Sequence, residues 1–485
     1  MNKKIFFSII SLFCCLSKLL SQDIVLELKS EQESKRLQKY TYSISNSLNN
    51  DLAIFIREKK NIQAYLFDNN FKVKSNFQYI SSKKKKYNVL LGNKISGEEY
   101  SLLYSNSNYT KFCIITFNFG SKTTRVQELD FVFNDDTYLI TVSDNNNLYV
   151  LTATGDQEIS IKKLNDDFSL EVVNKQVLDL DKKQKLNLNK YSYLENWTGI
   201  FAEKEASNIF KIDNRIPNAI EQVSKDNKIY KQGGNLYLTF DNKTESTLMY
   251  IINLSDFSIE RKEFPYPKGK LQDFKKQNSY FLDNVLFQIA SSNKEMALLA
   301  TSLDGDVLRS YYFNKETPIN IKNSAIIQDG KTALPFVTTR EFEETSKFLR
   351  KISSGKLGVS GYKKDNFYHF IIGGVKEVWQ GGGMMMPMTT STTITLPNNV
   401  PVVMYNPVFS SFNSYTTTKS TYFKTKLDLD FNYVKGDVNE NVFEKIKLYS
   451  DSLKYVSAED VFFHNNKLLF GYYDLKNENY KLVRF

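Results

Sequence analysis

The chain has 485 residues, of which 41% are hydrophobic and 24% charged, and its mean hydropathy is −0.40. This length is sufficient for a large buried core, and the composition is that of a globular protein. The net charge of +10 arises from 64 basic and 54 acidic residues spread along the whole sequence. This distribution excludes the usual nucleic-acid-binding surface, in which basic side chains gather together with stacking aromatic rings.

The first 22 residues predict a cleaved secretory signal peptide. Lys3 and Lys4 give a basic start, residues 5–16 are apolar, and residues 17–21 are more polar. An apolar run of about 12 residues is too short for a membrane span, which needs about 20. We therefore expect an exported protein, periplasmic, outer-membrane-associated or secreted. It should have no transmembrane span after cleavage, and peripheral association with the envelope is left open.

Cys113 is the only cysteine that remains after cleavage, since Cys14 and Cys15 lie in the signal sequence. A single thiol cannot form an intramolecular disulfide, so the exported chain must fold without one. Cys113 stands in the apolar run of residues 112–117. This setting favours a small buried side chain in a strand over a reactive nucleophile.

A polar turn followed by an alternating apolar strand recurs about every 48 residues along the chain. The strands that follow these turns begin near residues 52, 100, 148 and 236. The clearest turns are Asn145-Asn146, Gly233-Gly234 and Asn465-Asn466. Asn and Gly are typical of tight hairpin turns because they accept positive φ angles.

The strand rhythm resembles that of β-propellers, whose blades are four-stranded antiparallel sheets. Residues 40–79 contain four strand patterns separated by polar turns and therefore predict one blade. The resemblance implies an all-β fold, a single propeller of seven or eight four-stranded blades over residues 23–485. We expect residues 24–28 to close the ring by pairing with residues 480–485, which would hide two strand edges. An array of two-sheet β-sandwiches is the alternative.

Two segments interrupt the repeat. Residues 181–225 lack clear alternation and predict either an irregular blade or an insertion, with some helix around residues 218–224. Residues 379–415 are rich in Gly, Met, Thr and Pro and predict a long insertion within a blade. Loops that project from a rigid scaffold commonly carry recognition, so the second insertion is the candidate functional segment.

The candidate binding residues of this insertion combine aromatic rings with clustered thioethers. Methionines give an adaptable apolar contact for a partner, and they also suit Cu(I). The alternative is a purely structural role, in which the loop covers a blade. The residues are Trp379, Met384, Met385, Met386, Met388 and Tyr405.

No known catalytic or cofactor motif occurs in the sequence. The two histidines are predicted in different settings, His369 in a strand and His464 in a turn, and so form no metal-binding pattern. Asp304-Gly305-Asp306 resembles a fragment of a calcium loop in composition but lacks the EF-hand spacing. We therefore predict no cofactor and no metal site, with calcium and copper as alternatives, and the catalytic residues, if any, are unknown.

The sequence favours an exported, noncatalytic binding or scaffold protein of the bacterial cell envelope. Its partner would be a protein or a polysaccharide, recognised through a propeller face and the inserted loop, and would not be a nucleic acid. The alternative is a propeller-type glycan-active enzyme, a hydrolase or lyase with a pair of carboxylates in the central channel. The 54 acidic residues do not single out such a pair.

Overall fold

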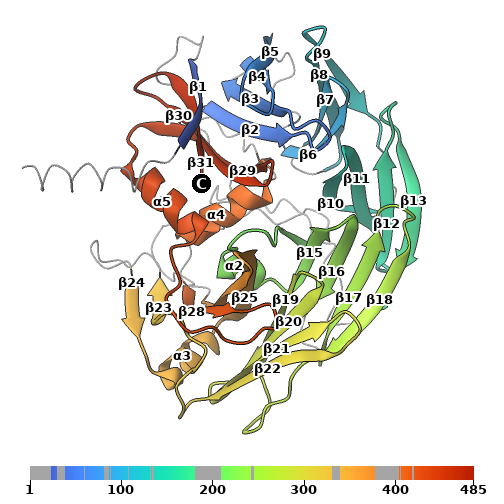
Figure 1. Cartoon of the computed structure of the whole chain (residues 1–485). Coiled ribbons are helices and arrows are strands. Elements are labelled where there is room, and N and C mark those ends of the chain that lie inside the picture. The colour runs from blue at the N-terminus through green and yellow to red at the C-terminus, as the bar shows by residue number, and fades with distance from the viewer. Residues whose placement is uncertain are drawn as a thin grey trace, which may run out of the picture. The chain divides into compact units, whose positions relative to one another are not determined.

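The computed structural model is an all-β protein (Figure 1). The residues it describes are 23–29, 39–58, 61–80, 87, 89–106, 109–131, 133, 136–180, 209–241, 245–329, 339–376, 403–404, 406–417 and 420–485. Within these ranges the strands form seven sheets of four or five strands each. A succession of small, mainly antiparallel sheets is the blade architecture of a β-propeller, so the predicted fold class is confirmed. Seven is the smaller of the two predicted blade numbers.

The chain divides into two compact units, Met1–Ser82 with Lys445–Phe485 and Lys83–Glu444. The first unit contains the first and the seventh sheet. The strands of the first sheet are β2 (Lys39–Ser45), β3 (Leu52–Glu58), β4 (Asn61–Phe67) and β5 (Val73–Ile80). Those of the seventh are β1 (Asp23–Lys29), β29 (Val456–His464), β30 (Lys467–Asp474) and β31 (Asn479–Arg484).

The N-terminal strand completes the C-terminal sheet. β1 pairs antiparallel with β31, from Asp23 opposite Arg484 to Lys29 opposite Asn479. The Arg484 guanidinium donates to Asp23 Oδ2 at 2.6 Å, and Leu26 packs in a cluster with buried side chains of the first and seventh sheets. The predicted pairing of the two ends of the described chain is therefore confirmed.

The second unit contains the other five sheets. The second sheet consists of β6 (Val89–Ser96), β7 (Glu99–Ser105), β8 (Phe112–Asn118), β9 (Thr123–Leu129) and β27 (Val403–Met404). The third consists of β10 (Thr137–Asp144), β11 (Asn147–Ala153), β12 (Glu158–Leu164) and β13 (Leu170–Val177). The fourth consists of β14 (Ile209–Ile212), β15 (Asn227–Gln232), β16 (Asn235–Phe240), β17 (Ser246–Asn253) and β18 (Ile259–Pro265).

The fifth sheet consists of β19 (Lys276–Leu282), β20 (Val285–Ser291), β21 (Glu295–Ser302) and β22 (Val307–Asn314). The sixth has the order β24 (Thr339–Phe342), β23 (Ile326–Asp329), β28 (Ser420–Leu427), β26 (Phe367–Val375) and β25 (Lys356–Lys364). The described helices are α2 (Ile220–Val223), α3 (Thr345–Ile352), α4 (Pro407–Thr417) and α5 (Val442–Ser452). None of these described helices has both the length and the apolar character needed to span a membrane.

The repeat in the sequence corresponds to a tight turn between two consecutive antiparallel strands of a sheet. In five sheets both central residues of this turn have positive φ, which is the backbone of a type I′ hairpin. The pairs are Asn145-Asn146, Gly233-Gly234, Asp283-Asn284, Asp365-Asn366 and Asn465-Asn466. Only Gly, Asn and Asp accept these angles at low cost, so the turn chemistry made the repeat visible in the sequence.

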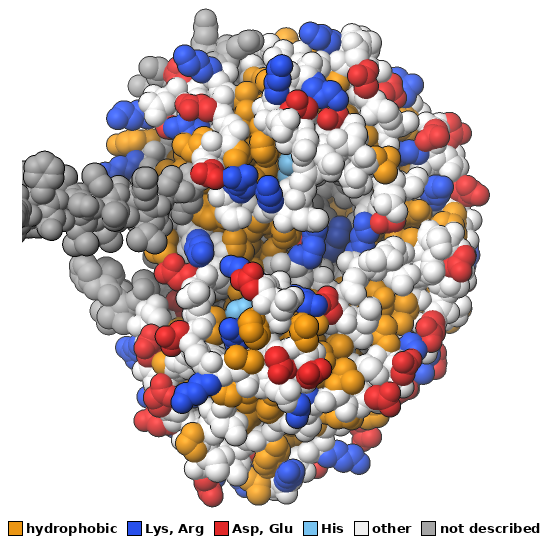
Figure 2. All heavy atoms as spheres, viewed as in Figure 1, with side chains coloured by type: hydrophobic (Ala, Val, Ile, Leu, Met, Phe, Trp, Pro, Cys, Tyr) orange, Lys and Arg blue, Asp and Glu red, His pale blue; other side chains and the backbone are white. Residues whose placement is uncertain are grey.

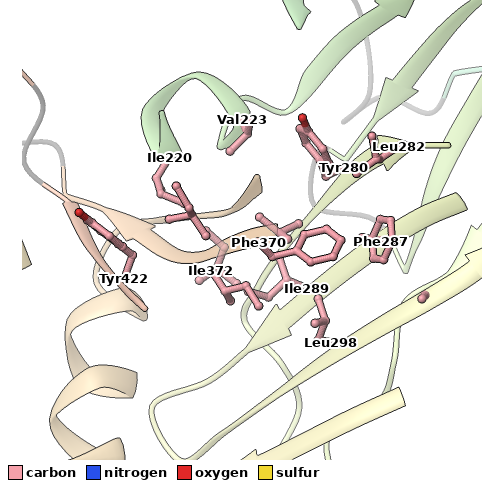
Figure 3. Packing of buried hydrophobic residues seen from close by; sticks show 14 of the residues in the cluster. Ile220, Val223, Tyr280, Leu282, Phe287, Ile289, Leu298, Phe370, Ile372 and Tyr422 are labelled. Atoms are coloured by element: carbon pink, nitrogen blue, oxygen red, sulfur yellow. The ribbon is translucent and has the colours of Figure 1, made fainter. Parts of the chain in front are cut away.

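The largest apolar cluster of the second unit joins the fourth, fifth and sixth sheets (Figure 3). Phe287 of β20 and Phe370 of β26 lie next to each other, with ring centroids 4.6 Å apart. Helix α2 packs onto β25 at Gly358, where a Cβ atom would lie 3.0 Å from both Ile220 O and Val223 Cγ2. Cys113 of β8 is 1% exposed, which confirms the prediction of a buried strand residue.

The two interruptions of the repeat add elements to neighbouring sheets. In the described part of the first interruption, β14 pairs parallel with β15, and α2 follows where some helix is predicted. In the second, β26 and β28 are sheet neighbours although residues 376–419 separate them. β27, from within that segment, pairs parallel with β6.

Residues 324–356 do not form a sheet of their own. β23 and β24 instead become the outer strands of the sixth sheet, next to β28. Helix α3 then leads into β25, and its Phe348 packs on Phe423 with ring centroids 5.5 Å apart. The third strand of this sheet comes from beyond the insertion, so its true partners are distant in sequence.

Candidate functional site

The inserted segment contains every residue that the sequence assigns to ligand contact, and all of them lie outside the described residues. Their contribution to binding therefore stays a prediction. They are Trp379, Met384, Met385, Met386, Met388 and Tyr405.

His369 lies on β26, as predicted for a strand residue, and is half-buried. Its ring stacks on Tyr362 of β25, with centroids 5.3 Å apart and an interplanar angle of 14°. Burial lowers the pKa of His369, and the positive charges of Lys426 and Lys364 lower it further. The imidazole is thus held neutral by its surroundings.

His464 is the last residue of β29 and precedes the Asn465-Asn466 turn. It is 2% exposed, and burial lowers its pKa. Asn465 Nδ2 lies 3.2 Å from Nε2, and Ser45 Oγ lies 2.8 Å from Nδ1. Because an amide nitrogen can only donate, Nε2 accepts, and Nδ1 carries the proton that is donated to Ser45. His464 therefore links the first and seventh sheets within the first unit.

A polar pocket of about 590 Å³ opens between hairpin turns of the fourth and fifth sheets. This size lies within the range of typical small-ligand sites. Three turns supply its walls, those between β15 and β16, between β19 and β20, and between β21 and β22. The lining residues are Gln232, Gly233, Asn235, Tyr237, Asn284, Ser302, Leu303 and Asp304.

Side-chain amides connect the two sheets at this pocket. Gln232 Nε2 donates to Asn284 Oδ1 at 3.0 Å. Asn214, which is 7% exposed, donates from Nδ2 to the carbonyl of Phe281 at 3.1 Å and approaches Gln232 Oε1 at 3.4 Å. Asn235 Nδ2 lies 3.4 Å from the hydroxyl of Tyr237. These contacts orient the amides of Gln232, Asn284 and Asn235 at the opening.

The Asp304-Gly305-Asp306 sequence forms a hairpin turn at the rim of the pocket. Ser302 N donates to Asp306 O at 2.9 Å, Gly305 N donates to Ser302 O at 3.1 Å, and Gly305 has a φ of 93°. Asp306 N also donates to Ser302 Oγ at 3.1 Å. These bonds give the segment the geometry of a hairpin turn. In the part of the chain that the structure describes, no three or more His, Cys, Asp and Glu side chains gather where they could hold a metal ion.

Ion pairs brace the turns on both sides of the pocket. Lys231, next to Gln232, lies 2.6 Å from Asp144 Oδ1 at the end of β10. Asp283, next to Asn284, accepts from the hydroxyl of Tyr368 at 3.1 Å and pairs with Lys363 at 3.3 Å. The third and sixth sheets thus hold the two turns of the pocket from outside.

Buried carboxylates elsewhere in the second unit are saturated by donors of the fold itself. Asp241 accepts from Lys228 Nζ at 2.6 Å, from Ser279 Oγ at 2.8 Å, from Thr247 Oγ1 at 2.9 Å and from the hydroxyl of Tyr266. The pKa of Tyr266 is well above its ordinary value because of burial and the adjacent carboxylate. Asp241 therefore stabilises the contact between the fourth and fifth sheets.

Glu295 has a similar structural role in the fifth sheet. Its carboxylate accepts backbone N–H bonds from Lys270 at 3.2 Å, Leu271 at 2.8 Å and Gln272 at 2.9 Å, together with the hydroxyl of Tyr312. Burial raises the pKa of Glu295, but these donors outweigh it and leave the pKa below its usual range. The same environment raises the pKa of Tyr312 to about 12.

The pocket was not predicted from the sequence, although its turns were in part recognised. Gly233-Gly234 is one of the predicted repeat turns, and Asp304-Gly305-Asp306 resembles a calcium-loop fragment in composition. Turns at the same position of successive blades lie on the same edge of the fold. From that rule, the turns at Gly233 and Asn284 could have been predicted to lie side by side. The structure was needed to show that residues 302–304 also line the pocket.

No protein-family model and no curated protein matches the sequence. Similar solved structures include a prolyl endopeptidase at 10% identity and a TM-score of 0.33, over 90% of this chain and 46% of that protein. The β-propeller domain of the Trilobed protease from Pyrococcus furiosus matches at 10% identity and a TM-score of 0.25, over 60% of this chain and 79% of the domain.

The SapL1 lectin in complex with α-methyl fucoside matches at 6% identity and a TM-score of 0.23, over 70% of this chain and 89% of the lectin. The match to the prolyl endopeptidase covers less than half of that protein's own length. At such identities and TM-scores, the likeness transfers neither a site nor an activity to this chain.

Proposed function

We propose that this chain is an exported, noncatalytic binding protein of the cell envelope with the β-propeller type of fold. It recognises a protein or polymer ligand through the pocket between the fourth and fifth sheets and through the inserted segment 379–415. The observation that carries the proposal is the pocket lining, which consists mainly of neutral polar side chains held in place by a chain of amides. Such a surface binds by hydrogen bonding and offers little for acid–base chemistry.

The hydrogen bonds and ion pairs of the buried carboxylates support a noncatalytic role. Asp241 and Glu295 each accept several bonds from the fold, and Glu58 pairs with Lys39 in the first sheet. A general acid or base needs a proton that it can exchange with substrate near neutral pH. Carboxylates that are saturated by internal donors stabilise the sheets instead.

The signals for export and the charge distribution support an envelope location. The basic and apolar start of the sequence is typical of a secretory signal peptide. Figure 2 shows basic and acidic side chains interspersed over much of the visible face. A surface of mixed sign suits a soluble or peripherally attached protein that binds a ligand at a local site.

The proposal is tested by incubating the mature chain separately with polysaccharide and with protein fractions from the envelope of the producing cell. We expect saturable binding in one fraction by biolayer interferometry, and mass spectrometry should recover the ligand intact. Ligand recovered in cleaved or otherwise altered form would overturn the noncatalytic assignment. Absence of binding in both fractions would overturn the function as a whole.

The role of the inserted segment is tested by deleting residues 381–399. We expect an unchanged melting temperature and at least about a tenfold loss of affinity for the ligand identified above. A deletion within a sheet, such as that of the turn residues 166–168, would be a poor control because it removes part of a hairpin. A scrambled sequence of residues 381–399 keeps the length and is the better comparison. Unchanged affinity after deletion would remove the segment from the proposal.

A further inference from the structure

We propose that the pocket between the fourth and fifth sheets binds a neutral saccharide unit. This inference rests on the proposed binding function and specifies its ligand class. A site for a neutral sugar must supply both donors and acceptors, because each sugar hydroxyl both donates and accepts hydrogen bonds. The pocket presents side chains of both kinds around one opening: Asn284 as a donor, and Asn235 and Asp304 as acceptors.

The donor character of Asn284 follows from its contacts. Its Oδ1 already accepts from Gln232 Nε2 at 3.0 Å, and among the described residues its Nδ2 has no partner. The side chain of Asn284 is exposed and lines the pocket, so both N–H bonds of Nδ2 are available to a ligand. One amide can thereby donate to two hydroxyl oxygens.

The acceptor character of the opposite rim comes from Asp304 and Asn235. The Asp304 carboxylate is exposed, and the described part of the chain supplies no bond to it. Asn235 directs its Nδ2 toward the hydroxyl of Tyr237 at 3.4 Å, which leaves Oδ1 as an acceptor. A carboxylate and an amide oxygen together accept hydrogen bonds from neighbouring hydroxyls of one sugar ring.

The charge of the lining selects against acidic ligands. Asp304 is the only Asp, Glu, Lys, Arg or His among the eight lining residues. The nearest basic neighbour in sequence, Lys231, is occupied by Asp144 and by the carbonyl of Ser143. A phosphate, sulfate or uronate placed here would meet the carboxylate without a compensating cation, so the ligand should be neutral.

The apolar content of the pocket argues for a sugar over a protein anchor. Leu303 is half-buried and gives one small apolar contact, suited to the C–H groups of a pyranose. Tyr237 is 4% exposed and stacks on Phe281 at 4.1 Å, so its ring faces are not open to a ligand. Protein partners usually insert an aromatic or arginine anchor into a deep apolar pocket, which this site does not provide.

The backbone of the pocket is prepared for binding. Gly233 and Gly234 have φ of 58° and 80°, and a Cβ atom on either would meet no other atom within 4 Å. The turn from Ser302 to Asp306 is closed by two backbone bonds of 2.9 and 3.1 Å. Few groups need to be ordered when a ligand enters, which lowers the entropic cost of binding.

The test uses the full mature chain on an array of neutral, amino and acidic saccharides, followed by titration calorimetry with the best neutral oligosaccharide. We expect Asp304→Ala, which removes an acceptor of the ligand, and Gln232→Ala, which removes the donor that orients the Asn284 amide, each to weaken binding by about tenfold. Asp273→Ala and Gln127→Ala are the matched controls, because Asp273 is exposed and Gln127 half-buried away from the pocket lining. Each control should change the affinity by less than about twofold.

The possible results separate this inference from the function on which it rests. Binding of acidic saccharides alone, or neutral binding that both pocket variants leave unchanged, would overturn the assignment of a neutral saccharide to this pocket. Binding of an envelope protein that competes at the pocket would overturn the saccharide class and leave the binding function standing. If neither saccharide nor envelope protein binds, both proposals fail.

Discussion

Lys228 and Asp241 form an ion pair that is completely buried, with Nζ 2.6 Å from Oδ2 and no exposed surface on either side chain. Lys228 also donates to Asn278 Oδ1 at 3.0 Å and to the carbonyl of Lys225 at 2.8 Å. The pair therefore ties the fourth sheet to the fifth. Lys39 and Glu58 of the first sheet form a second buried pair, at the start of β2 and the end of β3.

Lys228→Met should lower the free energy of unfolding by about 3–5 kcal/mol, because it leaves the Asp241 carboxylate buried without its cation. Lys175→Met is the matched control, since Lys175 is 54% exposed and lies 3.6 Å from Glu158. That change should cost less than about 1 kcal/mol. Urea denaturation measures both. Equal, small effects would show that the buried pair contributes little to stability.

Leu26→Asp should destabilise the first unit by about 2–5 kcal/mol, since Leu26 of β1 packs in the cluster with Leu469 and Leu482. Leu48→Asp introduces the same side chain where the leucine is 73% exposed, and it should change stability by less than about 0.5 kcal/mol. The melting temperature and limited proteolysis report the difference. An unaffected Leu26→Asp variant would mean that β1 is not needed to complete the seventh sheet.

Asn366→Ala should cost about 1 kcal/mol of stability, because Asn366 has a φ of 61° at an exposed turn position. Asn366→Gly should retain or slightly raise stability, since glycine adopts this conformation without strain. Chemical denaturation of the two variants side by side gives the comparison. If alanine is tolerated as well as glycine, the turn between β25 and β26 does not require positive φ.

The stability of the first unit should fall as the pH is lowered from about 7 to 5 because of His464. Burial lowers its pKa below the usual value of about 6.5, so the folded state favours the neutral ring. The stabilising contribution is complete above about pH 6.5 and is lost as the pH falls through the lowered pKa. The two histidines of the chain give two C2–H signals in a proton NMR titration, and His464→Gln assigns them.

His369 must be followed in the same titration, since burial and two lysines lower its pKa as well. We expect both signals to titrate below about pH 6.5. His464→Gln should flatten the pH dependence of unfolding between pH 7 and 5 without removing it. A His464 signal that titrates above the usual value would contradict a buried neutral ring whose Nε2 accepts from Asn465.

The features predicted from the sequence are those that depend on neighbouring residues. The turn at Asn145-Asn146 is predicted from the φ angles that its two residues accept. The burial of Cys113 is predicted from the apolar character of its own strand. The pairing of β1 with β31 was predicted by the rule that sheet edges are covered, because β29 to β31 left one edge open.

The features that the sequence did not reveal depend on contacts between distant segments. β23 meets β28, a strand some hundred residues further along the chain, as in the bond from Lys424 N to Ser324 Oγ with a separation of 100 residues. The amide chain of the pocket likewise joins Gln232 to Asn284 across two sheets. No local pattern encodes such partners, since each strand presents similar side chains to any neighbour.

The pairing of β1 with β31 sets an order for the assembly of the first unit. The guanidinium of Arg484 and the carboxylate of Asp23 are 461 residues apart in sequence, so the seventh sheet cannot be completed until β31 has been synthesised. The third and fifth sheets are built from consecutive hairpins and can form as soon as their strands emerge. β1 therefore remains without β31 as its partner throughout the synthesis of the five sheets of the second unit.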